Sequence, residues 1–318
     1  MAGGRDRKPC GELDRALTLR LTCQRQQGGF RMTTFGISVA LLTPFDATGD
    51  VDGSRLASHA ARLMQRGANG VTLFGTTGEG ASVGLSERPA VLSAFRAAAI
   101  DPKRVTMGLC ATSVADTLAQ AHQAHEAGIR SFLLTPPFYF EPDAEGLYDW
   151  HAAVLAQVPE GSRAILYHIP QVTNVPLPLP LIARLRAAFG DRVRGVKDSS
   201  GDPANARALL QMRGGLEILI GDERRLHEAA RLGCAGAISG MANLHPARMS
   251  RILREAREDA ALSADVGEIV ARPVVPALKA ALSATDPAWA RIRPPLAPLP
   301  EAEAEALRAA LAVEPANG

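Results

Sequence analysis

The chain contains 318 residues, of which 47% are hydrophobic and 21% are charged. These proportions are typical of a globular protein and argue against a disordered, collagen-like or disulfide-dense chain. The formal net charge is only +2, which gives no indication of a nucleic-acid partner or of an anionic membrane surface. The apolar runs are short and interrupted by charged residues, so we expect no membrane-spanning helix.

The N-terminal segment and the cysteines bear on processing and cellular location. Residues 1–33 carry several arginines but no apolar core long enough for a signal peptide. We interpret them as a disordered extension or as the product of an upstream start codon, since Met32 opens a second start. The absence of CxxC spacing favours reduced thiols in a cytoplasmic enzyme over a zinc knuckle or a disulfide framework. The cysteines are Cys10, Cys23, Cys110 and Cys234.

Short apolar or β-branched runs recur along the chain, with amphipathic segments between them. The predicted strands are 36–42, 71–75, 105–109, 131–135, 164–168, 193–197, 217–220 and 236–239. Apolar residues at helical spacing predict helices between them, and the clearest of these are 54–66, 115–127 and 203–212. Strands about 20 to 35 residues apart, alternating with helices, are typical of a parallel sheet built from βαβ units.

The joints between elements and the number of strands favour a closed barrel. Gly67, Gly128 and Gly233 each stand after a predicted helix and shortly before a strand, where a left-handed residue ends the helix. No GxGxxG follows the first strand, which weakens a dinucleotide-binding interpretation. We therefore predict a (β/α)8 barrel over residues 34–243. A helical region follows over 244–318, with expected helical stretches at 245–258, 261–282 and 300–311 and proline-rich joints at 272–273 and 293–300.

Lys197 is the first candidate for chemistry. Only four of the 35 Lys and Arg residues are lysines, and Lys197 ends the sixth predicted strand. Active sites of such barrels lie at the C-terminal ends of the strands. A lysine that loses solvation there favours its neutral form, which can attack a carbonyl and form a Schiff base. The alternative is a lysine at the barrel rim that pairs with Asp198, and the sequence leaves both open.

Other strand ends carry groups that could serve the same site. Gly75, Thr76, Thr77 and Gly78 form a short loop whose hydroxyls and N–H groups could hold a carboxylate, or could simply make a tight turn. The phenol of Tyr167, one strand before Lys197, could relay a proton or could point to water.

The remaining polar groups have mainly structural interpretations. Glu79 is expected to cap the segment that follows it. Asp222 and Glu223 could bind substrate hydroxyls or cap the next helix. His122 and His125 share a helix without a carboxylate at ligand spacing, so we expect no metal site.

Five motifs occur in order at the predicted strand ends and belong together. They are TPF at 43–45, GTTGE at 75–79, TPPFYF at 135–140, LYHIP at 166–170 and GVKDSSGD at 195–202. Over about residues 34–311 the chain resembles the dihydrodipicolinate synthase / N-acetylneuraminate lyase family of class I aldolases. The resemblance implies a (β/α)8 barrel with a C-terminal helical region, assembled as a homotetramer or dimer.

The resemblance also implies roles for individual residues. Lys197 would form a Schiff base with pyruvate, and Tyr167 would relay protons. Thr76 would link Tyr167 to Tyr139, while Thr77 would hold the carboxylate of the 2-oxo acid by its hydroxyl and backbone N–H. Further substrate-binding positions implied in this way are Gly78, His168, Gly221, Glu223 and Ile238.

Two positions depart from the family pattern. Val172 stands where the dihydrodipicolinate synthases carry an arginine for the distal carboxylate of their aldehyde substrate. A valine cannot make that contact, which argues against the lysine-pathway synthase activity. His168 replaces the usual asparagine, and it could polarise a substrate group or pack on the barrel rim.

We therefore expect a lyase that acts on pyruvate or a 2-oxo sugar acid by reversible aldol cleavage or condensation with an aldehyde. The lysine supplies the electron sink, so no metal or organic cofactor is expected. Dehydration of a deoxy-keto sugar acid would use the same Schiff base and remains an alternative. A non-catalytic binding barrel is the rival from another class, and the set of Thr76, Thr77, Tyr167 and Lys197 argues against it.

Overall fold

Eight parallel strands close into a barrel, in which each strand pairs with the next and β8 pairs with β1. The computed structural model describes residues 35–212 and 214–311, so the extension expected at 1–33 lies outside the described residues. The strands are β1 (Gly36–Ala40), β2 (Gly70–Leu73), β3 (Val105–Leu109), β4 (Ser131–Leu134), β5 (Arg163–His168), β6 (Val193–Asp198), β7 (Glu217–Ile220) and β8 (Gly236–Ser239). The predicted (β/α)8 barrel is confirmed, and no predicted strand end is displaced by more than two residues.

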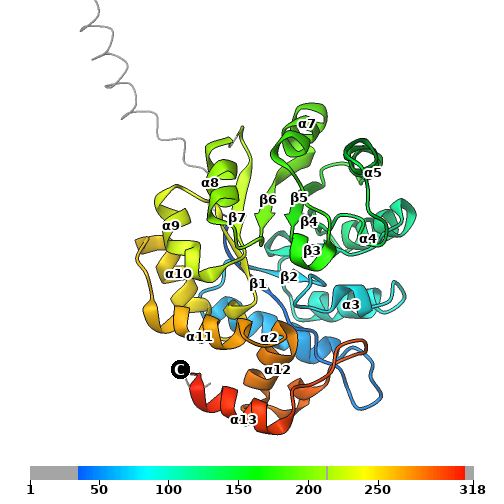
Figure 1. Ribbon diagram of the computed structural model, residues 1–318. Helices are drawn as coiled ribbons and strands as arrows, with labels where there is room; N and C mark the ends of the chain where they lie inside the picture. The colour runs from blue at the N-terminus through cyan, green and yellow to red at the C-terminus, as the bar shows by residue number, and fades with distance from the viewer. Residues whose placement is uncertain (1–34, 213, 312–318) are drawn as a thin grey trace, which may run out of the picture. The chain divides into compact units, whose positions relative to one another are not determined.

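Helices follow the strands and form a layer around the barrel (Figure 1). They are α2 (Gly53–Gln65), α3 (Arg88–Ala97), α4 (Val114–Glu126), α5 (Ala144–Gln157), α6 (Pro170–Thr173), α7 (Leu179–Phe189), α8 (Pro203–Met212), α9 (Leu226–Arg231) and α10 (Pro246–Glu255). Helix α10 contacts β1 and α9, so it takes the place of the eighth barrel helix. The boundary expected between residues 243 and 244, which separates the barrel from the helical region, stays a prediction. Helix α10 lies on the C-terminal side of that boundary.

Three helix-to-strand joints contain glycine in a left-handed conformation, as predicted. The φ angles of Gly67, Gly128 and Gly233 are +105°, +85° and +78°. A residue with a Cβ would meet steric strain at these angles. The repeated joint thus lets each helix end sharply and the next strand begin within a few residues.

The helical stretch expected over 261–282, with its proline joint at Arg272-Pro273, forms two helices. Helix α11 (Ala260–Val270) ends before Pro273, and α12 (Val274–Ser283) begins after it. Proline lacks a backbone N–H to donate, and its ring disfavours the helical conformation of the preceding residue. The break lets α12 contact both α11 and α13 (Glu301–Ala310).

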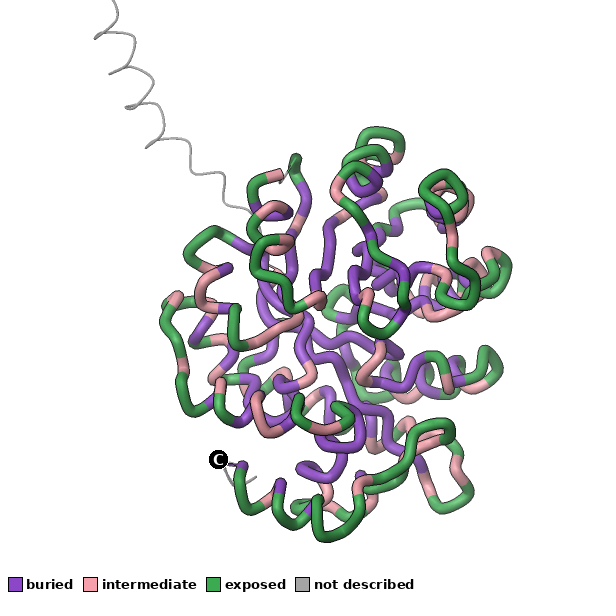
Figure 2. The backbone as a smooth tube through the Cα atoms, in the orientation of Figure 1, coloured by how far each residue is buried: buried purple, intermediate pink, exposed green. Residues whose placement is uncertain are grey.

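Two hydrophobic cores lie on opposite sides of the barrel wall. The larger one fills the space between strands and helices. The smaller one fills the barrel interior, and Figure 2 shows the strands as a buried centre. Its buried members are Ala40, Leu133, Ile165, Tyr167, Ile169, Leu219, Ala235 and Ile238. Side chains that point into the barrel are therefore held in a close-packed, rigid environment.

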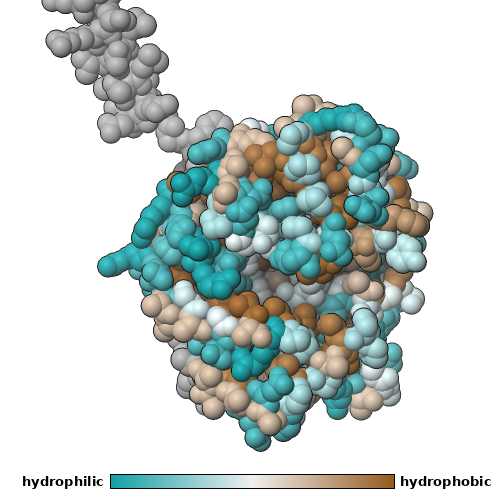
Figure 3. All heavy atoms as spheres, in the orientation of Figure 1, coloured by the Kyte–Doolittle hydropathy of each residue, from teal (hydrophilic) through white to brown (hydrophobic). Residues whose placement is uncertain are grey.

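The helical layer presents mainly polar side chains to the outside. In Figure 3, hydrophilic residues cover much of the outer part of the visible face, and hydrophobic surface shows between them nearer the middle. Among the described residues, no helix is long and apolar enough to span a membrane.

Asn243 ties the exit of β8 to β1. It ends the short 3-10 segment η5 (Met241–Asn243), and its Nδ2 donates to the carbonyls of Ala40 and Gly240, both at 2.8 Å. Its Oδ1 accepts from the Leu42 N–H at 3.3 Å and lies 3.2 Å from His59 Nε2. Burial lowers the pKa of His59 to about 4, so the imidazole is neutral at pH 7. One buried amide thus serves partners on three elements.

We expect Asn243→Ala to lower the free energy of unfolding by about 2–3 kcal/mol, because it leaves several buried polar groups without a partner. Urea unfolding followed by circular dichroism would measure the change. The exposed Gln157 at the end of α5 gives a control, since Gln157→Ala should change stability by less than about 0.5 kcal/mol. Equal losses in the two variants would contradict the assignment.

Candidate active site

The pairing register brings four side chains to one level near the C-terminal ends of the strands. Tyr167 on β5 lies opposite Lys197 on β6. Continued one residue past the ends of β3 and β4, the same register adds Cys110 and Thr135 to this level. Alternate strand residues face the same side, and Tyr167 belongs to the interior core. We call Cys110, Thr135, Tyr167 and Lys197 the lysine row.

Lys197 is buried, with 5% of its surface exposed, and its partner is a phenol. Its Nζ donates to the Tyr167 hydroxyl at 3.1 Å and lies 4.2 Å from the centre of the ring. The Thr76 hydroxyl donates to the same oxygen at 3.4 Å. In residues 35–212 and 214–311, Lys197 forms no ion pair, so the alternative of a rim lysine paired with Asp198 is not what the structure shows.

The loop from Gly75 to Gly80 is a tight turn that leaves two N–H groups available. The N–H groups of Gly78, Glu79 and Gly80 all donate back to carbonyls within the loop. Within the described part of the chain, the N–H groups of Thr76 and Thr77 donate to no acceptor. Adjacent free N–H groups form a concavity suited to an anion such as a carboxylate.

Gly78 and Gly240 hold this loop against neighbouring strands. The Thr43 hydroxyl donates to the Gly78 carbonyl at 2.6 Å. A Cβ at Gly78 would stand 2.8 Å from the Leu41 carbonyl oxygen, so the close approach requires glycine. On the other side, a Cβ at Gly240 would lie 3.5 Å from the Thr77 hydroxyl. The Thr77 side chain is thus placed beside the exit of β8.

Glu79 does not cap the following segment, which corrects the sequence-based expectation. It precedes the 3-10 turn η1 (Gly80–Ser82) but makes no side-chain cap bond. Its buried carboxylate lies 2.5 Å from Lys279 Nζ, and its other oxygen accepts from the Arg293 N–H at 3.1 Å. Burial lowers the pKa of Lys279, and the Glu79 carboxylate opposes this effect. The loop is therefore tied to the C-terminal helices.

The structure does not bring His168 into the lysine row. His168 pairs in register with Asp198, and both follow residues that face the interior, so their side chains point toward the helical layer. Its Nδ1 accepts the Leu177 N–H at 3.0 Å. Burial lowers the pKa of His168, while Asp198 and Asp202 oppose the shift. Of the two alternatives, this geometry favours packing at the barrel rim.

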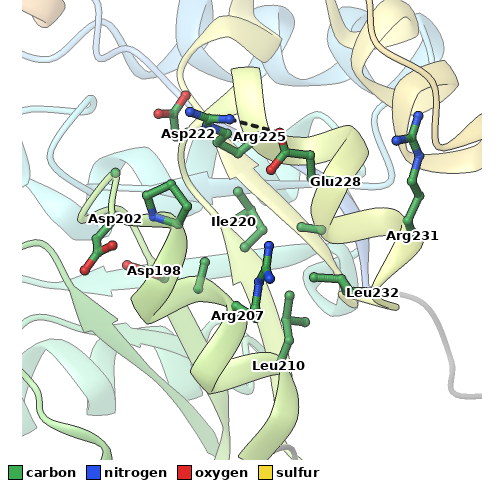
Figure 4. A pocket seen from close by; sticks show the side chains of 14 residues that line it. Asp198, Asp202, Arg207, Leu210, Ile220, Asp222, Arg225, Glu228, Arg231 and Leu232 are labelled. Atoms are coloured by element: carbon green, nitrogen blue, oxygen red, sulfur yellow. Dashed lines mark hydrogen bonds and ion pairs between the residues drawn. The ribbon is translucent and has the colours of Figure 1, made fainter.

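A cavity of about 260 Å³ lies on that outer side of the wall, between α8 and α9. Figure 4 shows Asp198, Ile220 and Asp222 lining it with charged side chains from both helices. Lys197 does not line it. The two faces of β6 therefore serve different spaces, and the lysine row lies inside the barrel.

The other predicted substrate-binding residues have mixed positions. Ile238 lies in the interior core together with Tyr167. A Cβ at Gly221 would collide with the Ser199 hydroxyl at 2.0 Å, so the two residues are in close contact. Glu223 accepts from the Ser239 hydroxyl at 2.6 Å and from the Met241 N–H at 3.4 Å, and burial raises its pKa. Its carboxyl group thus holds the exit of β8.

Tyr139 lies away from the Thr76–Tyr167 pair within one chain. It is 78% exposed and contacts Phe140 edge to face, with ring centres 5.0 Å apart. The link from Thr76 to Tyr139 is therefore not made in the single chain.

Cys110 and Thr135 were missed by the sequence analysis. The Cys110 thiol lies 3.4 Å from the Thr135 hydroxyl, and burial raises its pKa. The signal that could have found them is register, because Cys110 immediately follows one predicted strand and Thr135 ends the next, at the level of Lys197. Among the described residues, no group of three or more His, Cys, Asp or Glu side chains could hold a metal ion.

The chain is thus a closed (β/α)8 barrel in which a lysine is buried against a tyrosine. In barrels of this class, a lysine amine can react with a carbonyl. The model of the dihydrodipicolinate synthetase family matches residues 33–314. An uncharacterized DapA-like lyase of Chloroflexus aurantiacus is 36% identical over 286 residues, which cover 86% of this chain and 95% of that protein.

Solved structures agree with this match. Dihydrodipicolinate synthase from Agrobacterium tumefaciens is 42% identical with a TM-score of 0.84, covering 87% of this chain and 98% of that one. The sialic acid aldolase of Ruminococcus gnavus shares the fold, with 21% identity, a TM-score of 0.77 and coverage of 87% and 95%. The chain belongs to the dihydrodipicolinate synthetase family. It is an aldolase-type lyase, and Schiff-base chemistry is general to this family.

The position of Cys110 gives a test of the lysine row. We expect iodoacetamide to alkylate Cys110 slowly, because burial keeps the thiol protonated and the thiolate is the reactive form. A 2-oxo acid bound at Lys197 should slow the reaction further. Cys234, buried near the start of β8 at the opposite end of the barrel, is the control. Peptide mass mapping would measure both, and equal protection of the two cysteines would contradict the placement.

Proposed function

We propose that the protein cleaves and forms carbon–carbon bonds next to a 2-oxo acid through a Schiff base on Lys197. The observation that supports this most strongly is the contact of the buried Lys197 Nζ with the Tyr167 hydroxyl, which Thr76 also reaches. The partner of this amine is a hydroxyl group, which can both donate and accept a hydrogen bond. Pyruvate, free or as part of a longer 2-oxo sugar acid, is the proposed substrate core.

In the cleavage direction, the Lys197 amine attacks the C2 carbonyl and water leaves, giving a protonated imine. Tyr167, having given its own proton to the departing water, then accepts the proton of the C4 hydroxyl as the C3–C4 bond breaks. The bonding electrons move into the imine and form an enamine, while the C4 fragment leaves as an aldehyde. Protonation at C3 and hydrolysis return the amine and release pyruvate. Condensation is the reverse sequence, with Tyr167 returning the proton.

The loop 75–80 would hold the carboxylate of the 2-oxo acid. The N–H groups of Thr76 and Thr77, together with the Thr77 hydroxyl, supply donors at the barrel mouth. Charge-assisted hydrogen bonds of this kind orient the C2 carbonyl toward the amine.

The second substrate is proposed to be an aldehyde or sugar acid without a distal carboxylate at the Val172 position. Val172 lies on α6 and is 55% exposed. Its side chain offers neither charge nor hydrogen bonds, so it cannot pair with a carboxylate there. This argues for an acceptor recognised by its hydroxyl groups.

We also propose that the enzyme works in the cytoplasm as a homotetramer or dimer. Cys110 is a free thiol, which suits a reducing compartment. Tyr139 and Phe140 are each 78% exposed and adjacent, an aromatic surface of the kind that a second subunit covers. Such contact would give Tyr139 its only route to a role, since it lies away from the site of its own chain.

Borohydride reduction in the presence of pyruvate tests the Schiff base. We expect a reduced pyruvyl adduct on Lys197, identified by peptide mass mapping. Lys197→Arg should abolish it, because a guanidinium stays protonated. Lys103, on an exposed loop, is the internal control and should stay unmodified. An adduct only with a longer 2-oxo acid would favour the dehydratase, and none with either would leave a binding barrel.

Tyr167→Phe tests the proton relay separately from binding. Removal of the hydroxyl should lower kcat by about 10²–10⁴-fold, since the departing oxygen loses its proton acceptor. The concentration of pyruvate that half-saturates borohydride trapping should stay nearly the same. Turnover at the wild-type rate would remove Tyr167 from the mechanism.

A further inference from the structure

Lys279 is a second buried lysine, and the C-terminal helical region supplies it. It lies on α12, and its Nζ is 2.5 Å from Glu79 Oε1 and 2.7 Å from the carbonyl oxygen of Arg291. Neither side chain of the pair is exposed. Such a pair is retained in a protein interior only where its geometry offsets the loss of hydration. The Glu79–Lys279 pair lies beside the candidate active site, at the loop 75–80.

Glu79 stands two residues after Thr77, in the loop that would bind the carboxylate. Its φ is 52°, a left-handed conformation that residues other than glycine rarely adopt. The ion pair with Lys279 and the hydrogen bond from the Arg293 N–H fix its carboxylate on both oxygens. Surrounding contacts therefore determine the backbone here, and with it the direction of the preceding N–H groups.

The neighbouring residue of α12, Leu278, lies close to Gly240 at the exit of β8. A Cβ at Gly240 would lie 3.0 Å from Leu278 Cδ1 and 3.5 Å from the Thr77 hydroxyl. Leu278 thus packs beside the exit of β8 where Thr77 lies, while Lys279 binds Glu79. Two successive residues of α12 therefore pack against the loop 75–80 and against the exit of β8 beside it.

We propose that Lys279 is a positioning residue for substrate binding: it neutralises and anchors Glu79, so that the Thr76 and Thr77 N–H groups can donate hydrogen bonds to the carboxylate of the 2-oxo acid. This inference rests on the proposed function, in which that carboxylate binds the loop. Lys279 itself touches neither the substrate nor the reacting atoms.

The charge of Glu79 explains why a cation is needed. Without Lys279, a buried negative charge would stand two residues from the groups that bind a negatively charged substrate. Coulomb repulsion in a poorly polarisable interior is screened much less than in water. Arg293 does not replace the lysine, because its guanidinium binds both oxygens of Glu87, at 2.6 and 2.9 Å.

The test is a titration of pyruvate in the borohydride-trapping assay on the full chain. We expect Lys279→Met to raise the half-saturating pyruvate concentration by at least about tenfold, with the final amount of adduct unchanged. Glu79→Gln removes the negative charge, so its half-saturating concentration should equal that of the wild type or fall below it. The double variant Glu79→Gln/Lys279→Met should return to within about threefold of the wild type.

A merely structural pair would not shift the half-saturating pyruvate concentration in opposite directions in the two single variants. Leu307→Ala, which removes a buried side chain of α13, is the matched control for lost stability in the same region. It should lower Tm while leaving the pyruvate concentration nearly unchanged.

The outcomes separate this inference from the proposed function. No adduct in the wild type would reject the proposed function. Two results would overturn the role of Lys279 while the wild type titrates normally. One is an unchanged half-saturating pyruvate concentration in Lys279→Met, and the other is an equal increase in both single variants. If Lys279→Met fails to fold, the remaining variants decide. A half-saturating pyruvate concentration that is higher in Glu79→Gln than in the double variant would then overturn the role of Lys279.

Discussion

The parallel register between β5 and β6 is the constraint on which the site depends. It sets Tyr167 opposite Lys197, and closure of the barrel holds both strands between fixed neighbours. A slip of one residue would turn this pair toward the helices and bring His168 and Asp198 inward. The amine would then leave the barrel interior. The chemistry of one side chain therefore depends on the packing of all eight strands.

Local patterns explain how much of this could be predicted from the sequence. Alternating apolar runs and glycine joints are short-range signals, and they gave all eight strands to within two residues. The rule that barrel sites lie at strand ends selected Lys197 and Tyr167, and the resemblance supplied Thr76 as their neighbour. Their contact in the structure is what that reasoning implies. The proline joint noted at Arg272-Pro273 is where α11 and α12 separate.

The residues that escaped prediction depend on side-chain direction or on distant pairing. His168 looked like a site residue because it follows Tyr167, yet alternation along the strand turns it to the opposite face. Cys110 enters the row only through the register of four strands. The partner of Glu79 comes from α12, near the other end of the chain, and no local pattern indicates that pairing. The spacing of motifs along the sequence therefore identifies the strand ends, but it does not identify the side chains that contact them.

The two buried lysines show how a partner decides what a cation can do. A hydroxyl group can hold an amine by a hydrogen bond without forming an ion pair, which suits the reaction proposed for Lys197. A carboxylate at 2.5 Å instead favours the ammonium form, which suits Lys279 as a fixed charge. The barrel supplies the reactive lysine and the C-terminal helices supply the fixed one, with the loop 75–80 between them. A substrate carboxylate entering this loop meets free N–H groups with the nearby acid already neutralised, so the helical region contributes to binding without entering the barrel.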